Sequence, residues 1–262
     1  MTAPPPPLLG EACALLDAAE AEGTPLRLLG GVAIRVLLGA RIDSRFSREM
    51  GDIDFITTRR AAHAVESLLT RHGWEPERQF NALNGARRLL FLGGDRAGKI
   101  DVFVERFQMC HALPLAERLP VRGQTLPAAE LVMSKLQIVA LNTKDRDDLY
   151  ALLAALEVTD ADFATAAGAD PGEPLDTIDA SRIAALAGAD WGLHHTFELN
   201  LERLRASAGE AGLGEELAAL VQRRVVALQQ ALHDAPKSRA WKLRARIGER
   251  RRWYEEPEEV ER

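Results

Sequence analysis

The sequence predicts an α/β (α+β) domain over residues 1–158, with a mixed sheet and flanking helices, followed by a helical C-terminal domain over residues 159–262. Strand and helix patterns alternate through the first part of the chain, which is typical of helices packed on a sheet. Beyond Thr159 only helical spacings of apolar residues remain. With 262 residues, of which 47% are apolar, the chain can bury a sizeable core in one or two domains, which argues against disorder.

The first expected elements come in the order helix, strand, helix. The spacing of apolar residues predicts a helix over Glu11–Glu22, which Gly23 ends. A short apolar strand, Leu26–Leu29, then runs into a glycine pair and the apolar helix Val32–Leu38. The glycines therefore mark a turn from strand to helix.

Alternating and helical patterns define the rest of this domain. Asp52–Ile56 alternates strictly between polar and apolar residues, which predicts a strand. Arg88–Leu92 and Ile100–Val104 flank a glycine-rich loop, so we expect them to form an antiparallel hairpin. The expected helices of this part are Arg59–His72, Ala128–Leu141 and Asp145–Leu156.

Helical stripes of apolar residues dominate the C-terminal part. They fall at Leu193, Phe197, Leu201, Leu204, Leu213, Leu217, Leu220, Val221, Leu228 and Leu232. Glycine and proline are concentrated in Gly168–Pro174, which is the best candidate for a linker. We therefore expect a helical domain that follows the sheet.

Charge and composition exclude several classes of protein. The net charge of −6 argues against a surface that binds nucleic acid everywhere. No run of about 18 apolar residues is present to cross a bilayer, and the opening residues lack the basic segment of a signal peptide, so we expect a cytoplasmic protein without a membrane partner. Cys13 and Cys110 lie far apart without metal-ligand spacing, which argues against a disulfide framework or a zinc site.

Three carboxylates and a glycine pair form the most informative pattern. Asp52 and Asp54 lie two residues apart on an expected strand, so their side chains project from the same face. Asp101 lies on another expected strand and would complete a cluster if the two strands are neighbours. Such carboxylates repel one another when buried, and a divalent cation removes that cost.

Magnesium and phosphate fit this pattern. Mg²⁺ prefers carboxylate oxygens together with substrate phosphates, and Mn²⁺ is a possible substitute. Backbone N–H groups at Gly30 and Gly31, at the start of a helix, are suited to bind phosphate. Each feature also has a structural explanation, since Asp52 and Asp54 can be the solvated face of an edge strand and Asp101 can pair with Lys99 or Arg88.

The order of these features resembles the DNA polymerase β-like nucleotidyltransferase superfamily. Its pattern is a glycine pair, then hydrophobic-Asp-hydrophobic-Asp, then a third carboxylate on a later strand. The downstream segment is similar to the AbiEii/MenT-type (type IV toxin-like) branch, through the helix LPAAELVMSKLQIVAL and the segment KDRDDL that follows it. The resemblance covers Leu26 to Leu156 and implies a nucleotidyltransferase-type fold.

The resemblance also implies roles for particular residues. Gly30 and Gly31 would form the phosphate-binding turn, with Arg48 near the triphosphate. Asp52, Asp54 and Asp101 would hold magnesium, and Asp101 would also be a base for the acceptor hydroxyl. Lys135 would reach the nucleotide triphosphate, and a late aspartate, Asp148 or Asp145, would orient the lysine or the nucleotide. A structural alternative is that Lys135 is an amphipathic-helix lysine and that Lys144 and Asp148 form an ordinary helical ion pair.

A basic segment near the C-terminus is the best nucleic-acid candidate. Its cations are Lys237, Arg239, Lys242, Arg244, Arg246, Arg250, Arg251 and Arg252. Trp241, Trp253 and Tyr254 lie among them and offer surfaces for base stacking. The alternative is a solvated face that balances the acidic tail, which can fold against it.

The resemblance implies transfer of a nucleoside monophosphate from an NTP to a hydroxyl acceptor, with magnesium as cofactor. The implied acceptor is RNA, a tRNA 3′ end, docked on the basic helix, with a toxin role and a possible antitoxin partner. Two alternatives stay open. One is a small-molecule acceptor of the antibiotic type, and the other is a degenerate module that binds a nucleotide or a partner without turnover, which Val32 favours because many relatives have serine there.

Overall fold

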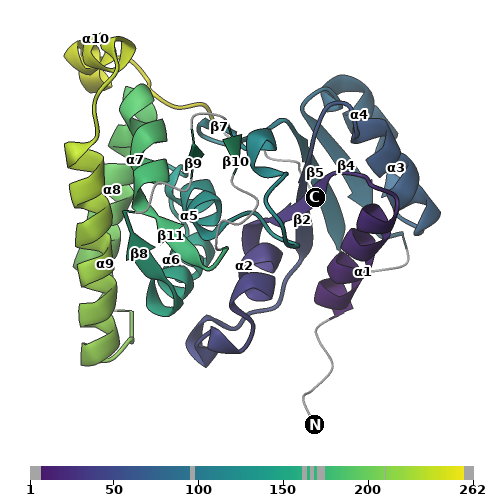
Figure 1. Cartoon of the computed structure of the whole chain (residues 1–262), viewed down its shortest axis with the longest axis horizontal. Helices are drawn as coiled ribbons and strands as arrows, with labels where there is room; N and C mark the ends of the chain where they lie inside the picture. Colours follow the sequence, from purple (N-terminus) through teal and green to yellow (C-terminus); the bar gives the residue numbers. More distant parts are fainter. Residues whose placement is uncertain are drawn as a thin grey trace.

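A five-stranded mixed sheet forms the centre of the N-terminal half, in the strand order β1-β2-β5-β4-β3 (Figure 1). The computed structural model describes residues 7–94, 98–160, 164–165, 168–169, 175–209 and 211–256. The strands are β1 (Leu26–Leu29), β2 (Asp52–Thr57), β3 (Glu75–Pro76), β4 (Arg88–Leu92) and β5 (Lys99–Val104). The sheet and its helices confirm the mixed α/β class.

Parallel pairing of β2 with β5 decides where the carboxylates meet. Asp54 lies directly opposite Asp101 in this pairing. The neighbouring pairs β1·β2 and β4·β5 are antiparallel, and β4·β5 is the expected hairpin. Both central strands bury apolar side chains, with Ile53, Phe55 and Val102 fully buried. The strand pattern of the sequence therefore reflects burial in the middle of the sheet.

Helices cover the sheet and link it to the rest of the chain. α1 (Pro7–Ala21) packs against α3 (Ala62–Arg71) and against β1. α2 (Gly30–Leu38) contacts β2 and also α5 (Ala128–Leu136) and α6 (Thr143–Ala155). α2 thus joins the sheet to the helices that complete the site.

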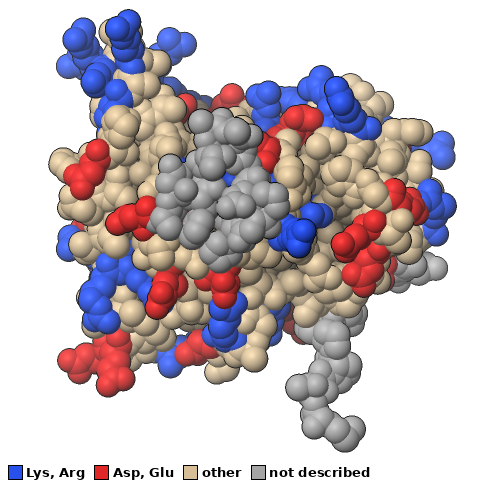
Figure 2. Space-filling view, in the orientation of Figure 1, with Lys and Arg blue, Asp and Glu red and all other residues tan. Residues whose placement is uncertain are grey.

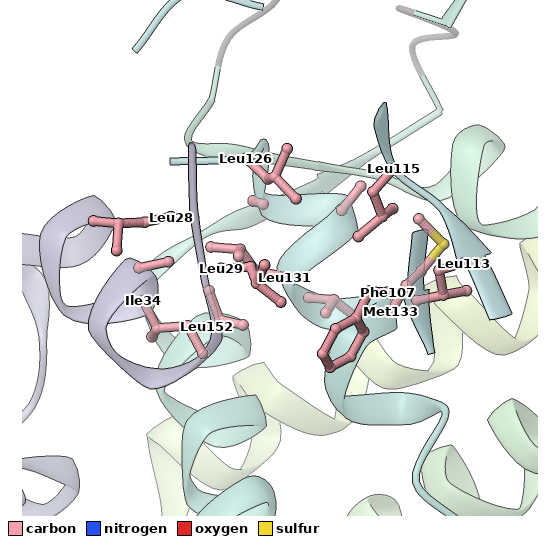
Figure 3. Packing of buried hydrophobic residues seen from close by; sticks show 14 of the residues in the cluster. Leu28, Leu29, Ile34, Phe107, Leu113, Leu115, Leu126, Leu131, Met133 and Leu152 are labelled. Atoms are coloured by element: carbon pink, nitrogen blue, oxygen red, sulfur yellow. The ribbon is translucent and has the colours of Figure 1, made fainter. Parts of the chain in front are cut away.

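The core beneath the site is made of leucines from both halves of this region. Figure 3 shows Leu29 of β1 facing Leu131 of α5 and Ile34 of α2 beside Leu152 of α6, while Leu28 points to the other side of β1. These five side chains are at most 1% exposed. A helix that is buried on nearly all sides, such as α5, is held in place by its neighbours. This packing makes the positions of polar groups on α5 and α6 well defined.

Helices dominate the C-terminal part, as expected. They are α7 (Ala180–Ala189), α8 (Trp191–Ser207), α9 (Glu215–Asp234) and α10 (Arg239–Ile247), seen at the left of Figure 1. α7, α8 and α9 contact one another, and Leu201, Leu204 and Leu228 of the predicted stripes are buried between them. Among the described residues, no helix has the length and hydropathy needed to cross a membrane.

The expectation that strands end before Thr159 was wrong. β8 (Glu157–Thr159) pairs in parallel with β11 (Thr177–Asp179), and β9 (Ala164–Thr165) pairs with β10 (Gly168–Ala169). Strands of two or three residues are too short to show a period of two in the sequence. The first two residues of the expected linker Gly168–Pro174 form β10, and residues 170–174 lie outside the described residues. The boundary between residues 158 and 159 stays a prediction.

α5 is shorter than expected, because it ends at Leu136 and not at Leu141. The Nδ2 atom of Asn200 in α8 donates to the carbonyls of Leu136 and Ile138, each at 2.8 Å. These bonds satisfy carbonyls that a longer helix would have paired internally. Asn142 then begins α6, since its side chain accepts a hydrogen bond from the Asp145 N–H at 2.9 Å.

Several short elements carried too little periodicity to be predicted. These are α4 (Arg78–Asn84), β6 (Arg106–Gln108) and β7 (Ala112–Pro114), and the 3₁₀ turns η1 (Gly39–Arg41), η2 (Ser44–Phe46), η3 (Ala116–Arg118) and η4 (Gly248–Arg250).

Candidate active site

A cleft of about 640 Å³ lies where β2, β4 and β5 meet α2, α5 and α6. A volume of this size is typical of small-molecule sites. The expected site residues that line it are Gly30, Gly31, Arg48, Asp52, Asp54, Asp101, Lys135 and Asp145. Asp148 lies behind this wall, where it bonds to Lys135 and Arg48. The tertiary fold therefore gathers the whole predicted set into one region.

A larger groove, of about 860 Å³, lies between α7 and α9. Its walls consist mainly of small apolar side chains, such as Ala184, Ala227 and Ala231. Such a lining offers little to a charged substrate. The cleft over β2 combines carboxylates, cations and a helix N-terminus, so it is the better candidate for chemistry.

The ionised form of Asp54 is disfavoured in the cleft. Burial, together with the negative charges of Asp52 and Asp101, raises the pKa of Asp54 to about 8. Lys135 and Lys99 oppose this rise but do not cancel it. The ionised form of Asp54 is therefore disfavoured by burial first and by like charges second, and a bound cation would offset both effects.

Asp101 is already paired with cations from its own hairpin. Its Oδ1 atom lies 2.8 Å from Nε and 2.7 Å from Nη2 of Arg88, and its Oδ2 atom lies 3.0 Å from Nζ of Lys99. The ion-pair alternative for Asp101 is therefore present in the structure. Within the described part of the chain, no group of three or more His, Cys, Asp or Glu side chains is arranged to hold a metal ion. The carboxylates available to a cation as they stand are Asp52 and Asp54.

The glycine pair opens α2 directly beside Asp54. Gly30 has φ +72°, a backbone conformation that other residues rarely adopt, and a Cβ atom there would lie 2.1 Å from Oδ2 of Asp54. Leu29, which precedes the helix, provides no side-chain cap for its first N–H groups. Uncapped N–H groups at a helix start bind anions well. Gly30 thus allows the turn that opens α2 and the strand that carries Asp54 to touch.

Substitution of Gly30 tests this contact. We expect Gly30→Ala to lower the melting temperature and to displace the Asp54 side chain, because the new Cβ atom combines an unfavourable φ with a clash. Gly23→Ala is the matched control, since Gly23 has φ +65° but nothing within 4 Å of its Cβ position. Thermal unfolding of the two variants should differ by about 1 kcal/mol or more, and equal melting temperatures would contradict the close approach.

Lys135 lies at the centre of a second charged cluster, between α5 and α6. Its Nζ atom lies 2.7 Å from Oδ1 of Asp145 and 3.0 Å from Oδ2 of Asp148. Nη2 of Arg48 lies 3.0 Å from the same Asp148 oxygen. Although burial opposes the charged form, the carboxylates of Asp148 and Asp145 raise the pKa of Lys135 to about 12. Lys135 is therefore a fixed, buried cation and not a lysine whose ammonium group extends into solvent.

The two late aspartates, Asp145 and Asp148, occupy different positions in this cluster. Asp145 lines the cleft and pairs with Lys135, whereas Asp148 pairs with both Lys135 and Arg48 from behind. Both carboxylates hold the lysine in this arrangement. The three-residue spacing that left the sequence undecided puts them on one side of α6.

Arg88 is a feature of the site whose importance the sequence did not show. Its guanidinium lies over the rings of Phe80 and Phe103, at 5.7 Å and 5.2 Å from their centroids, while it also pairs with Asp101. Stacking and ion pairing together leave Arg88 little freedom to move. The sequence presented it only as one possible partner of Asp101, because α4, which supplies Phe80, was not predicted.

The basic segment lies on α10, away from the cleft. Lys and Arg side chains gather over α10 at the upper left of Figure 2. Its rings face inward, since Trp241 packs edge-on against His194, and Trp253 packs against Trp191 and His195. These tryptophans hold α10 and the residues after it on α8, so the expected stacking surface is not formed by them.

The comparisons with known proteins add a distant structural likeness. No family model matches the chain, and no curated protein matches it. A crystal structure of an antigenic nucleotidyltransferase-like protein from Paracoccidioides brasiliensis is similar over 89% of this chain and 95% of that chain, with a TM-score of 0.40 and 14% sequence identity. At this level of likeness, the residues of the cleft have to carry the functional assignment.

Proposed function

We propose that the chain is a magnesium-dependent nucleotidyltransferase that transfers a nucleoside monophosphate from an NTP to a hydroxyl acceptor. The observation that carries the proposal is the contact between the Gly30 turn and Asp54, in a cleft that also holds Asp52 and Lys135. An anion site and a cation site lie side by side there. An NTP with its divalent cation is the substrate class that needs both.

The residues present fit magnesium. Asp52 and Asp54 share one face of β2, and the pKa of Asp54, which burial and the charges of Asp52 and Asp101 raise, supports a bound positive charge at this point. Mg²⁺ is commonly held by one or two carboxylates together with phosphate oxygens, which is what this pair offers, and Mn²⁺ should substitute. When bound, the ion would activate the acceptor hydroxyl and stabilise the leaving pyrophosphate.

The chain's own groups would bind and orient the NTP. N–H groups in the first turn of α2 would bind the phosphates, and Lys135 and Arg48, which line the same cleft, would supply positive charge. The acceptor oxygen forms a bond to the α-phosphorus as the bond to pyrophosphate breaks, and the hydroxyl proton passes to a base in the cleft. We keep Asp101 as the candidate base and third carboxylate, held next to Asp54 by Arg88 and Lys99.

For the acceptor we propose RNA, with the 3′ end of a tRNA as the specific case. The support is the resemblance of the segment Leu26 to Leu156 to the toxin branch and the exposed cations of α10. A toxin role, with a protein antitoxin as partner, belongs to the same proposal.

Transfer of radiolabel from each α-labelled NTP, in the presence of Mg²⁺, tests the proposal. Bulk tRNA, an aminoglycoside and the protein itself should be offered as acceptors, with Asp52→Ala as the inactive variant. We expect labelled tRNA with the wild type only. Labelling of the aminoglycoside alone would replace the RNA acceptor by a small molecule, and equal labelling by the wild type and Asp52→Ala would refute the catalytic assignment.

A further inference from the structure

A segment near the C-terminus returns from α10 to the margin of the cleft. Figure 1 shows the yellow trace leaving α10 and running back past β7. We call residues 251–256 the C-terminal strap. Arg244 of α10 holds its start, because its Nη2 atom donates to the carbonyl of Arg251 at 2.6 Å. The first residue of the strap is therefore fixed to α10 by a hydrogen bond.

Trp253 anchors the middle of the strap on α8. Its indole Nε1 donates to Oγ1 of Thr196 at 3.0 Å, and its ring packs against Trp191 and His195. The carbonyl of Trp253 lies so close to Gly192 that a Cβ atom there would approach it to 2.6 Å. The absence of a side chain at Gly192 therefore lets the strap lie against the helix.

The last described residues of the strap reach the catalytic half. The Glu255 N–H donates to the carbonyl of Cys110 at 3.0 Å, and Nε2 of Gln108 donates to the Glu255 carboxylate. Glu255 and Glu256 then line a small cavity of about 80 Å³. The Glu255 carboxylate is therefore fixed beside the sheet, whereas the Glu256 carboxylate pairs with Arg252 of the strap itself.

Three arginines also line this cavity. Arg87, Arg88 and Arg106 line it, and Arg88 and Phe103 are also part of the wall of the catalytic cleft. The cavity therefore adjoins the place where the acceptor must approach. Arg88 is already held by Asp101 and by two aromatic rings, so its side chain loses little conformational entropy when a ligand binds.

We propose that Arg87, Arg88 and Arg106 form a binding site for phosphate groups of a single-stranded RNA backbone, and that the negative charges of Glu255 and Glu256, which line the same cavity, oppose RNA binding in the free protein. Guanidinium groups bind phosphate through paired hydrogen bonds, whereas the charges of the two glutamates repel the RNA. Naming this RNA as the acceptor rests on the proposed nucleotidyltransferase activity, whereas the binding itself does not.

This repulsion predicts that removal of the two charges strengthens RNA binding. Fluorescence anisotropy of the full chain with a short labelled single-stranded RNA, without NTP and with a chelator present, measures this directly. We expect Glu255→Gln/Glu256→Gln to bind about tenfold more tightly than the wild type. Glu215→Gln/Glu216→Gln is the matched control, because it removes the same charge from an exposed pair at the start of α9, and it should change binding much less.

Arg106→Gln tests the arginines of the site. It should weaken RNA binding and reduce the salt dependence of the affinity by about one released counterion. Equal affinities for the two double-glutamine variants would overturn the proposal, as would an unchanged salt dependence in Arg106→Gln or the absence of RNA binding in every variant. Because these experiments measure RNA binding and no transfer step, they test the binding site even if the protein shows no transfer activity. Conversely, Asp52→Ala should lose transfer activity. In the Asp52→Ala background, Glu255→Gln/Glu256→Gln should still strengthen RNA binding.

Discussion

Asp54→Asn is expected to lose nucleotidyl transfer while it stabilises the metal-free protein. We expect the rate to fall by about a thousandfold or more, which corresponds to about 4 kcal/mol of lost transition-state stabilisation. The stability should rise because the asparagine removes a carboxylate that burial and the charges of Asp52 and Asp101 disfavour. A gain in stability together with a loss of activity distinguishes a functional carboxylate from a structural one.

The gain in stability should depend on pH in a defined direction. The pKa of Asp54 is raised from 3.8 to about 8 in the folded protein. Between these values the unfolded chain has released a proton that the folded protein keeps, so the wild type loses stability as pH rises and then levels off above about pH 8. The variant lacks this loss. Its advantage should therefore grow from about pH 4 to about pH 8 and reach a few kcal/mol at most.

Chemical unfolding at several pH values, with a chelator present, measures this difference. Asp17→Asn, at an exposed position on α1, is the control and should follow the wild type. Addition of Mg²⁺ should raise the melting temperature of the wild type and much less that of Asp54→Asn, because only the wild type keeps both carboxylates. A pH-independent difference between Asp54→Asn and the wild type would show that Asp54 is ionised without cost.

Lys135→Met should cost more stability than any surface lysine substitution. The Lys135 side chain is 12% exposed and faces Asp145 and Asp148, which are 12% and 7% exposed. Without the ammonium group, Asp148 keeps Arg48 as a cationic partner, whereas Asp145 keeps a hydrogen bond from the neutral Asn142 amide, so we expect a loss of about 3–5 kcal/mol in the free energy of unfolding. Transfer activity should also be lost, since Lys135 is a cation that the proposed mechanism uses to bind the phosphates.

Urea unfolding of Lys135→Met and of two further variants separates the causes. Lys144→Met, at an exposed position on α6, should stay within about 0.5 kcal/mol of the wild type. Adding Asp145→Asn to Lys135→Met should recover part of the lost stability but none of the activity. A Lys135→Met protein as stable as the wild type would mean that the two aspartates do not need the lysine.

Local patterns were enough to predict the elements that shape the site. The alternation in Asp52–Ile56 predicted both a strand and the shared face of Asp52 and Asp54, because side-chain direction along a strand is a local property. The glycine turn that opens α2 was predicted for the same reason, since the change from strand to helix period occurs within a few residues.

Contacts between distant segments were beyond such patterns. That β5 lies beside β2, with Asp101 opposite Asp54, depends on the pairing of the whole sheet. The early end of α5 depends on Asn200, which comes from a helix more than sixty residues later in the chain. The strap depends on Gly192 and Thr196 of α8, which no spacing in the sequence relates to Trp253.

By itself the sequence determined which side chains are available and in which order, namely a glycine turn, two carboxylates on one strand face, a later carboxylate, and a lysine and aspartates on helices. The tertiary structure decided how their charges are balanced. Asp101 and Lys135 found partners within the protein, whereas Asp54 was left beside like charges. The physical reason is that periodicity acts over a few residues, while electrostatic energy depends on distances in space and on burial, which only the packed chain sets.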